Sequence, residues 1–352
     1  MPINYEPING QTDVATTRTL LHEVIPLTGT IVSGTYGTFP NDSNVKNYSH
    51  GQFQSVYDYP YLSSSANHIF DLTIGYDESS GLSGSTDAVQ EKKKINMYNQ
   101  MSQVLLGYTG SANTVRLFES DLKLDGQGSM KEVFFVNFSR LLTKDQIKKG
   151  SVSITLVTGA YAASGPAGGT ITYTDAEASD TQGTLNTVGG DYGILLDKSV
   201  SPPLTGGIVF YQSGIAVLTA SAFSGSSYGP PSDFYDGNTI EEWLVSGSIS
   251  GSCDALRQRI SNIQFNNSTE INSKVYFCRA PHNKFNYSSN PTYVNNGSIR
   301  VKNENRSNPP ISYITTIGLY NSSNELLAVA KLSEPLRKDP TNELTLRVRL
   351  DY

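Results

Sequence analysis

The strongest constraint on the fold is a series of short segments in which apolar and polar residues alternate. The clearest is residues 344–350, Leu-Thr-Leu-Arg-Val-Arg-Leu, and similar segments occur at 68–76 and 151–157. Successive side chains of a β-strand point to opposite faces, so a period of two predicts strands with one buried and one solvated face. The chain is therefore expected to be built mainly from strands.

The composition agrees with a turn-rich β protein. Charged residues make up 16% of the chain, which is below the roughly 25% usual for soluble domains. Asn, Ser, Thr, Gly and Tyr take their place, and these residues favour turns and strands. We expect a mainly β fold with a few helices, a β-rich α+β class, with a C-terminal β-sandwich or meander.

The length of 352 residues predicts two domains or three small ones. Residues 1–30 are expected to form an arm that packs on a neighbour, with a plain first strand as the alternative. Residues 31–223 are assigned to a β-rich domain, and residues 224–263 to a Gly/Ser-rich linker with helices. Residues 264–352 are assigned to a C-terminal β-domain.

Helical spacing is found in a few places. Within residues 87–107 apolar residues recur every three or four positions, at Ile95, Tyr98, Met101, Val104 and Leu105. This pattern predicts an amphipathic helix that ends near Gly107. Further helices are expected at 240–244 and 252–263. Residues 158–191 are rich in Gly, Ala and Thr, which predicts an insertion or an exposed hairpin.

Charge and cysteine content exclude several functions. The net charge is −6 and the one basic run is Lys92–Lys94, so nucleic acid is not expected as the main ligand. Cys253 and Cys278 are too few for a disulfide scaffold. Two buried thiols are the favoured interpretation, and a disulfide between them is the alternative.

No targeting or membrane signal stands out in the chain. Residues 1–6 lack a charged region followed by an apolar one, as a signal peptide would require. No apolar run approaches the roughly 20 residues that span a bilayer. The expectation is a protein made in the cytoplasm, with no membrane partner.

No catalytic or metal-binding pattern in the sequence has convincing spacing. No two of the four histidines are four residues apart, and no Gly-x-Ser-x-Gly elbow occurs. The adjacent acids Glu241 and Glu242 point in different directions on a helix. Cys278 and His282 flank a proline, which would align them by accident only. We expect no catalytic residue, cofactor or metal, and a protein that is not an enzyme.

Three C-terminal segments carry a family resemblance. They are residues 313–321 (Tyr-Ile-Thr-Thr-Ile-Gly-Leu-Tyr-Asn), residues 325–338 (which begin Glu-Leu-Leu-Ala-Val-Ala), and residues 344–352. Together with residues 277–291, this stretch resembles the C-terminal module of structural proteins from tailed bacteriophages, particularly large contractile-tailed phages. It is also similar to the attachment domain of some tail-fibre proteins. The likeness covers roughly residues 250–352, and it departs from the fibre pattern in the turn at 321–324.

The resemblance implies a structural subunit of the virion, made in the host bacterial cytoplasm. The subunit would form part of the tail, baseplate or neck through contacts with other virion proteins and with copies of itself in a ring. A homo-oligomer of this kind turns modest contacts into a stable assembly. Recognition of a host-surface glycan, a tail-fibre attachment module and a capsid decoration protein are the alternatives.

The residues themselves suggest how such a module would fold. One hydrophobic face of a hairpin and the strand after it is expected to form the core of a docking module, from Ile317, Leu319, Tyr320, Leu327, Val329, Leu346 and Val348. Pro335 is expected to end the second strand, because it cannot donate to a ladder. The expected interface aromatics are Tyr57, Tyr59, Tyr61 and Trp243. The Tyr/Asn/Ser-rich N-terminal half also suits the stacking and hydrogen bonding of sugars.

Overall fold

The computed structural model describes residues 5–28, 42–84, 88–107, 115–121, 123, 127–157, 161–162, 165–166, 169–178, 187–223, 244, 247–288, 294–295, 298–301 and 311–352. In these residues the protein is mainly β, with three α-helices and one 3-10 turn, which confirms the expected fold class. The chain forms two compact units. Unit 1 comprises residues 1–20 and 270–352, and unit 2 comprises residues 21–269.

The chain passes between the units inside two long strands, β1 (Val14–Thr28) and β16 (Ile260–Ala280). Both units are therefore built from segments distant in sequence. The described part of residues 224–263, the predicted linker with helices, lies within unit 2. Residues 1–20, expected to be part of an arm, are grouped with the C-terminal strands.

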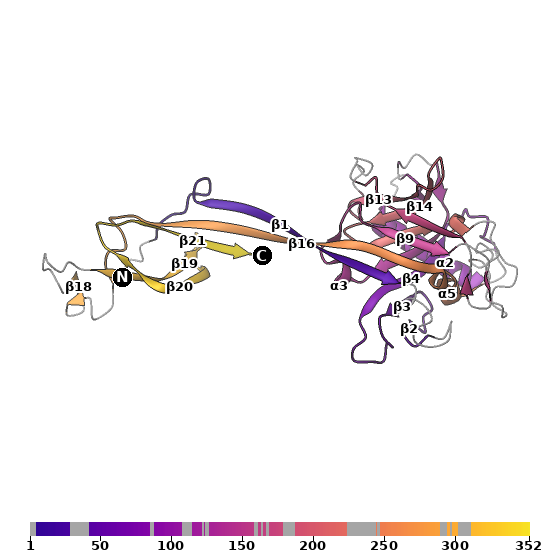
Figure 1. Ribbon diagram of the computed structural model, residues 1–352, viewed down its shortest axis with the longest axis horizontal. Helices are drawn as coiled ribbons and strands as arrows, with labels where there is room; N and C mark the ends of the chain where they lie inside the picture. The colour runs from indigo at the N-terminus through magenta and orange to yellow at the C-terminus, as the bar shows by residue number, and fades with distance from the viewer. Residues whose placement is uncertain are drawn as a thin grey trace. The chain divides into compact units, whose positions relative to one another are not determined.

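Unit 2 is dominated by one antiparallel sheet (Figure 1). Its strand order is β1-β16-β9-β12-β13-β14-β15-β7-β4-β3-β2, and β8 adds to β16. The strands introduced here are β2 (Val45–Asn47), β3 (Gln54–Tyr57), β4 (His68–Tyr76), β7 (Glu132–Phe138), β8 (Gln146–Ile147), β9 (Ser153–Val157), β12 (Thr170–Thr174), β13 (Tyr192–Asp197), β14 (Leu204–Phe210) and β15 (Ile215–Thr219).

Two small hairpins and three short helical elements also belong to the described part of unit 2. The hairpins are β5 (Phe118–Glu119) with β6 (Ser129–Met130), and β10 (Tyr161–Ala162) with β11 (Gly165–Pro166). The helical elements are α3 (Arg140–Thr143), η1 (Ala220–Phe223) and α5 (Ile249–Arg259). Within 158–191, the expected insertion, β12 pairs with β9 and β13 and so belongs to the large sheet.

The central strand β7 is buried on both of its faces. Phe134, Val136 and Phe138 enter one hydrophobic cluster, whereas Val133 and Phe135 enter a second cluster on the opposite face. Its neighbours β4 and β15 pair with it along most of their length. A strand that is covered on both sides reads as a continuous apolar run, which explains the sequence Val-Phe-Phe-Val at 133–136.

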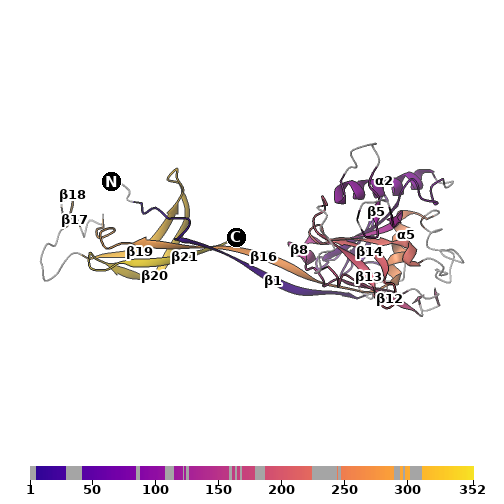
Figure 2. The ribbon, with the colours of Figure 1, turned by 90° about the horizontal axis from the view of Figure 1, so that it is seen from above.

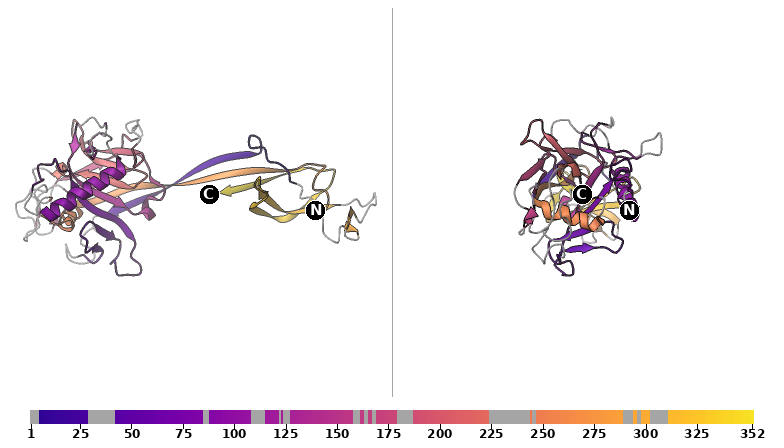
Figure 3. Two further views of the ribbon diagram at one scale, coloured as in Figure 1. Left: turned by 180° about the vertical axis from the view of Figure 1, so that it is seen from behind. Right: turned by 90° about the vertical axis from the view of Figure 1, so that its right-hand side faces the viewer.

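Helix α2 (Ala88–Leu105) covers the second cluster, and it confirms the helix expected at 87–107. It runs across the strands of the sheet (Figure 3). The helix approaches β4 so closely that a Cβ on Gly75 would lie 2.7 Å from the backbone nitrogen of Tyr98. Tyr98 is fully buried there, and its hydroxyl donates to the carbonyl of Met130 over 2.9 Å.

The bounds predicted for the helix at 252–263 are wrong at both ends. Helix α5 begins after Ser248, whose side chain accepts from the Gly251 N–H, and it ends at Arg259. Ile260 and Ile263 pair instead with Leu156 and Ile154 of β9. Their three-residue spacing fits a helix, but β-branched residues also favour strands and the neighbouring strand decides between the two. The helix expected at 240–244 lies outside the described residues except for Leu244.

A buried carboxylate joins two loops of unit 2. Asp175 accepts hydrogen bonds from the backbone N–H groups of Gly150 and Val152, and from the Tyr211 hydroxyl, each over 2.8 Å. Burial raises the pKa of Asp175 above its ordinary value, although these donors act in the opposite direction. The Tyr211 hydroxyl thus satisfies a charged group that water cannot reach.

We predict that Tyr211→Phe lowers the free energy of unfolding by about 1–3 kcal/mol, because it leaves the buried Asp175 carboxylate short of one donor. Urea denaturation followed by circular dichroism measures this difference. Tyr313→Phe is the matched control, because Tyr313 is 61% exposed. Equal unfolding midpoints for Tyr211→Phe and the control would show that Asp175 does not depend on this hydroxyl.

Candidate assembly surface

The described strands of unit 1 form three antiparallel groups. The second half of β16 pairs with β21 (Leu344–Asp351), with Ser273 opposite Asp351 and Ala280 opposite Leu344. The first part of β1 lies along the same half of β16, since the Phe277 N–H donates to the Asp13 carbonyl over 2.9 Å. Strands β19 (Ser312–Tyr320) and β20 (Leu326–Lys338) form a hairpin.

Figure 2 shows this hairpin beside β16 and β21. The described strands of unit 1 also include a small pair, β17 (Val294–Asn295) with β18 (Ser298–Val301). The hairpin expected within residues 313–338 and the strand expected at 344–350 are confirmed.

Unit 1 buries few apolar side chains. All members of both hydrophobic clusters belong to unit 2. In the described part of unit 1 the buried apolar residues are Val275, Ala280, Leu319 and Val348. Many large apolar side chains are instead exposed: Ile8, Leu20, Tyr287, Tyr313, Tyr320, Leu326, Leu327, Val329 and Tyr352. A domain of this length usually buries most of its apolar surface.

The expected docking-module residues separate into three groups by burial. Leu319 and Val348 are buried, and Ile317 and Leu346 are half-buried. Tyr320, Leu327 and Val329 are exposed, with fractions of 44%, 67% and 52%. These last three do not contribute to a core within the described residues, and they lie on the surface of the hairpin.

The exposed residues of the hairpin gather near its turn. We define the hairpin patch as Tyr320, Leu326, Leu327 and Val329. Tyr320 pairs with Leu326, and Val329 pairs with Gly318. The ring of Tyr320 lies over Gly318, where an added Cβ would come within 2.8 Å of it. The ring of Tyr320 also packs edge-on against Tyr5, with the ring centroids 5.0 Å apart.

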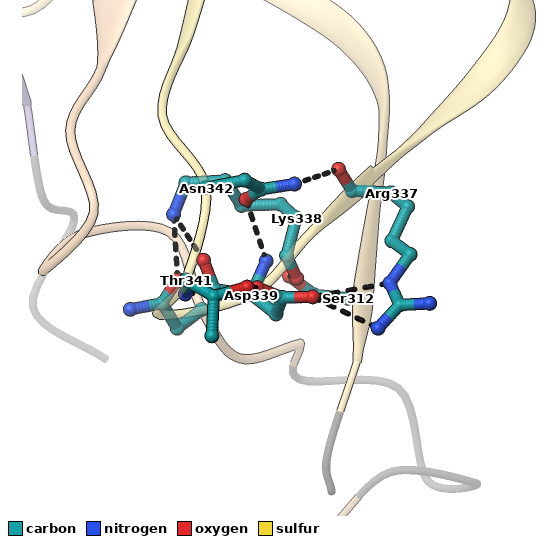
Figure 4. Close-up of polar contacts among 7 residues, drawn as sticks. Ser312, Arg337, Lys338, Asp339, Thr341 and Asn342 are labelled. Carbon is teal, nitrogen blue, oxygen red and sulfur yellow. Dashed lines mark hydrogen bonds and ion pairs between the residues drawn. The ribbon is translucent and has the colours of Figure 1, made fainter.

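The base of the hairpin is held by polar contacts (Figure 4). Lys338 is fully buried, and its ammonium group donates to the Asn286 side-chain oxygen over 2.7 Å and to the Asp339 carbonyl over 3.0 Å. Ser312 donates to the carbonyl of Phe285 over 2.8 Å. These bonds tie the first and last residues of the hairpin to the segment that follows β16, so polar groups fix it where apolar packing is sparse.

Asp339 organises the turn between β20 and β21. Its carboxylate accepts from the hydroxyl and the backbone N–H of Thr341, and from the guanidinium of Arg337 over 3.0–3.1 Å. The Thr341 hydroxyl, its N–H and Arg337 together lower the pKa of Asp339 below 3.8. The Asn342 side chain closes the turn by donating to the Arg337 carbonyl over 3.0 Å.

The expectation that Pro335 ends the second strand is wrong. Strand β20 continues to Lys338, and Pro335 lies in an irregular stretch of it. Ile314 pairs with Leu336 while Thr316 pairs with Lys331, so the residues between them bulge from the ladder. A bulge leaves its extra residues unpaired, and a proline is therefore tolerated there.

The expected interface aromatics lie in unit 2. Tyr57 is half-buried, and Tyr59 and Tyr61 are 50% and 37% exposed. Tyr57 contacts the rings of Tyr61 and His68, with centroids 6.4 and 5.5 Å apart. The structure therefore brings Tyr57 and Tyr61 together, next to a histidine that the sequence had not singled out. Trp243 lies outside the described residues.

Both cysteines are free thiols, so the disulfide alternative is wrong. Cys253 is fully buried in α5 and Cys278 is half-buried in β16. Burial raises the pKa of both thiols above the ordinary value. A raised pKa keeps a thiol protonated and unreactive at neutral pH, which fits a structural role for each.

Comparisons with protein-family models, curated proteins and solved structures found no match. Among the described residues no helix has the length and hydropathy to cross a membrane. In the same part of the chain no three His, Cys, Asp or Glu side chains gather in a way that could hold a metal ion.

We predict that Thr341→Val raises the pKa of Asp339 toward 3.8, because it removes the largest contribution to the lowered value. A carboxyl group with a lowered pKa adds stability above its unfolded pKa, and this contribution is lost as the pH falls through the folded value. Titration followed by carboxyl-carbon NMR measures the midpoint. The control is Thr345→Val, an exposed threonine on β21. A midpoint that Thr341→Val does not move would contradict the proposed hydrogen bond.

Proposed function

We propose that this chain is a non-enzymatic structural subunit of a tailed-phage particle, located in the tail, baseplate or neck, and that unit 1 contacts its neighbours. The observation that carries the proposal is the exposure of the hairpin patch in a unit that contains neither hydrophobic cluster. Contiguous exposed apolar side chains mark interaction surfaces in soluble proteins. The resemblance of residues 250–352 to phage structural modules supports the same assignment.

The hairpin is suited to docking because its shape does not depend on the patch. Its base is fixed by Lys338, Ser312 and Asp339. The exposed residues near the turn are then free to be covered by another subunit. A preorganised surface loses little conformational entropy when it binds, so the patch can drive association without refolding.

Repeated contacts of moderate size suit a ring. Full burial of one Leu or Val side chain contributes about 1.5–3 kcal/mol. The patch has three such residues and a tyrosine, and association costs about 4–15 kcal/mol in lost freedom of motion, so the net contact is modest. In a closed ring each subunit makes this contact twice, and the assembly is stable although a single contact is weak.

We predict that Val329→Ser weakens self-association by about tenfold, because it removes an apolar side chain from the contact. The free energy of unfolding should change by no more than about 0.5 kcal/mol, as expected for a surface position. Sedimentation velocity over a range of protein concentrations measures the association. Val89→Ser is the matched control, since Val89 is a 64% exposed valine on α2 in unit 2.

Two results would contradict this prediction. One is a wild-type protein that stays monomeric at every concentration, and the other is an equal loss of association in Val89→Ser.

Antibody-labelled electron microscopy of purified phage particles tests the location independently. Label on the tail, baseplate or neck is expected. Label on the capsid would favour a decoration protein, and particles without label would overturn the assignment to the virion.

A further inference from the structure

A second surface, in unit 2, has a different chemistry. Strands β2, β3, β4 and β7 carry one row of polar side chains across the sheet: Lys46, Ser55, Asp71 and Asn137, each opposite the next. The residues beside them in sequence, Val45, Val56, Phe70 and Phe138, are buried in the first hydrophobic cluster. The polar row therefore lies on the face of the sheet that points away from that cluster.

Helix α2 covers this same face only in part. It contacts the sheet at Gly75, four residues along β4 from Asp71. Asp71 and Asn137 are half-buried, in contrast to the fully buried Phe135 on the same face of β7. Asp71 and Asn137 are thus reachable from solvent at the end of the sheet where β2 and β3 lie.

Aromatic rings lie beside the polar row in two groups. In one group Tyr48, His50 and Phe53 lie within 4.8–5.1 Å of one another, measured between ring centroids. In the other, Tyr57 contacts the rings of His68 and Tyr61. None of these six rings is fully buried. Partly exposed aromatic faces are therefore available next to the polar groups.

Asp71 links the polar row to the aromatic residue His68. Its Oδ1 accepts from the Ser55 hydroxyl and is 2.8 Å from His68 Nε2. Its Oδ2 has no hydrogen-bond partner among the described residues. The Tyr48 hydroxyl lies 3.2 Å from Ser55 Oγ. Desolvation, followed by contact with Tyr48 and the charge of Asp71, raises the pKa of Tyr57.

The first aromatic group is held in place by neighbouring elements. The Thr73 hydroxyl donates to the Gln52 carbonyl over 2.6 Å, and the Lys93 ammonium group donates to the His50 carbonyl over 3.3 Å. The Lys46 ammonium group lies 4.7 Å from the centre of the Tyr48 ring. In the second group Asn67 and Asp58 close the loop that carries Tyr61, through two bonds of 2.6 and 2.8 Å.

We propose that this surface binds a neutral saccharide, which stacks on Tyr57 or Tyr48 and donates hydroxyl protons to Asp71. Sugar rings have apolar C–H faces that pack on aromatic rings, and hydroxyl groups that pair with carboxylates and amides. Asn137 provides an amide that can both donate and accept. Lys46 and Asp71 balance each other in charge, which suits a neutral ligand.

The charge of unit 2 argues against anionic ligands. Unit 2 contains 14 Lys and Arg residues against 23 Asp and Glu residues. A polyanion such as nucleic acid or an acidic polysaccharide would be repelled by this excess of negative charge. A saccharide-binding role goes beyond assembly, and it does not depend on the hairpin patch, which is in unit 1.

Saturation-transfer difference NMR on the full chain tests the proposal, with maltose, cellobiose, lactose and N,N′-diacetylchitobiose as probes. We expect saturable binding of at least one disaccharide with a Kd of about 0.1–10 mM. Tyr57→Ala and Asp71→Asn should each weaken that binding by about tenfold or more, because they remove a stacking surface and a charged acceptor.

The matched control is Tyr313→Ala, which removes an exposed tyrosine of unit 1 and should bind like the wild type. Asp71→Asn preserves size and shape, so its far-UV circular dichroism and melting temperature should match those of the wild type. The proposal is overturned if none of the four sugars binds saturably, or if both variants bind as tightly as the control. Sedimentation of Tyr57→Ala distinguishes the two functions, because its self-association should be unchanged.

Discussion

The burial of β7 on both faces is the constraint on which the rest of unit 2 depends. Phe134, Val136 and Phe138 require cover on one side, and Val133 and Phe135 require it on the other. Helix α2 supplies one cover through Tyr98 and Leu105, and α5 with the remaining strands supplies the second. Once these two clusters are filled, the ends of the same sheet remain open, and the polar row at Asp71 lies at such an end.

Unit 1 is stabilised in a different way. Its described strands bury few apolar side chains, and the base of its hairpin is fixed by a buried lysine, by Ser312 and by the turn around Asp339. Polar contacts determine geometry well, but they contribute little net free energy beyond about 1 kcal/mol each. We therefore propose that unit 1, which contains neither hydrophobic cluster, gains stability when another subunit covers the hairpin patch.

Alternation and helical spacing were sufficient to predict the fold class, helix α2 and the strands of the C-terminal hairpin. These patterns failed where the spacing of apolar residues fits both a helix and a strand, as at Ile260 and Ile263. The pairing of these residues with β9 decides for a strand, and this long-range contact cannot be read from the local sequence. Burial on the hairpin was also not predictable, because Leu327 and Val329 have the same pattern as core residues. The row from Lys46 to Asn137 could not be found in the sequence, since strand register brings together residues up to 91 positions apart.

Hydroxyl-radical footprinting of the hairpin patch tests the central claim most directly, because it reports the exposure of individual side chains. The isolated protein at low concentration should be oxidised readily at Tyr320 and Leu327. In assembled protein, oxidation of both should fall several-fold, while exposed Tyr59 of unit 2 keeps its rate. Equal oxidation of Tyr320 and Leu327 in the isolated and assembled forms would contradict the claim that this surface is covered by a neighbouring subunit.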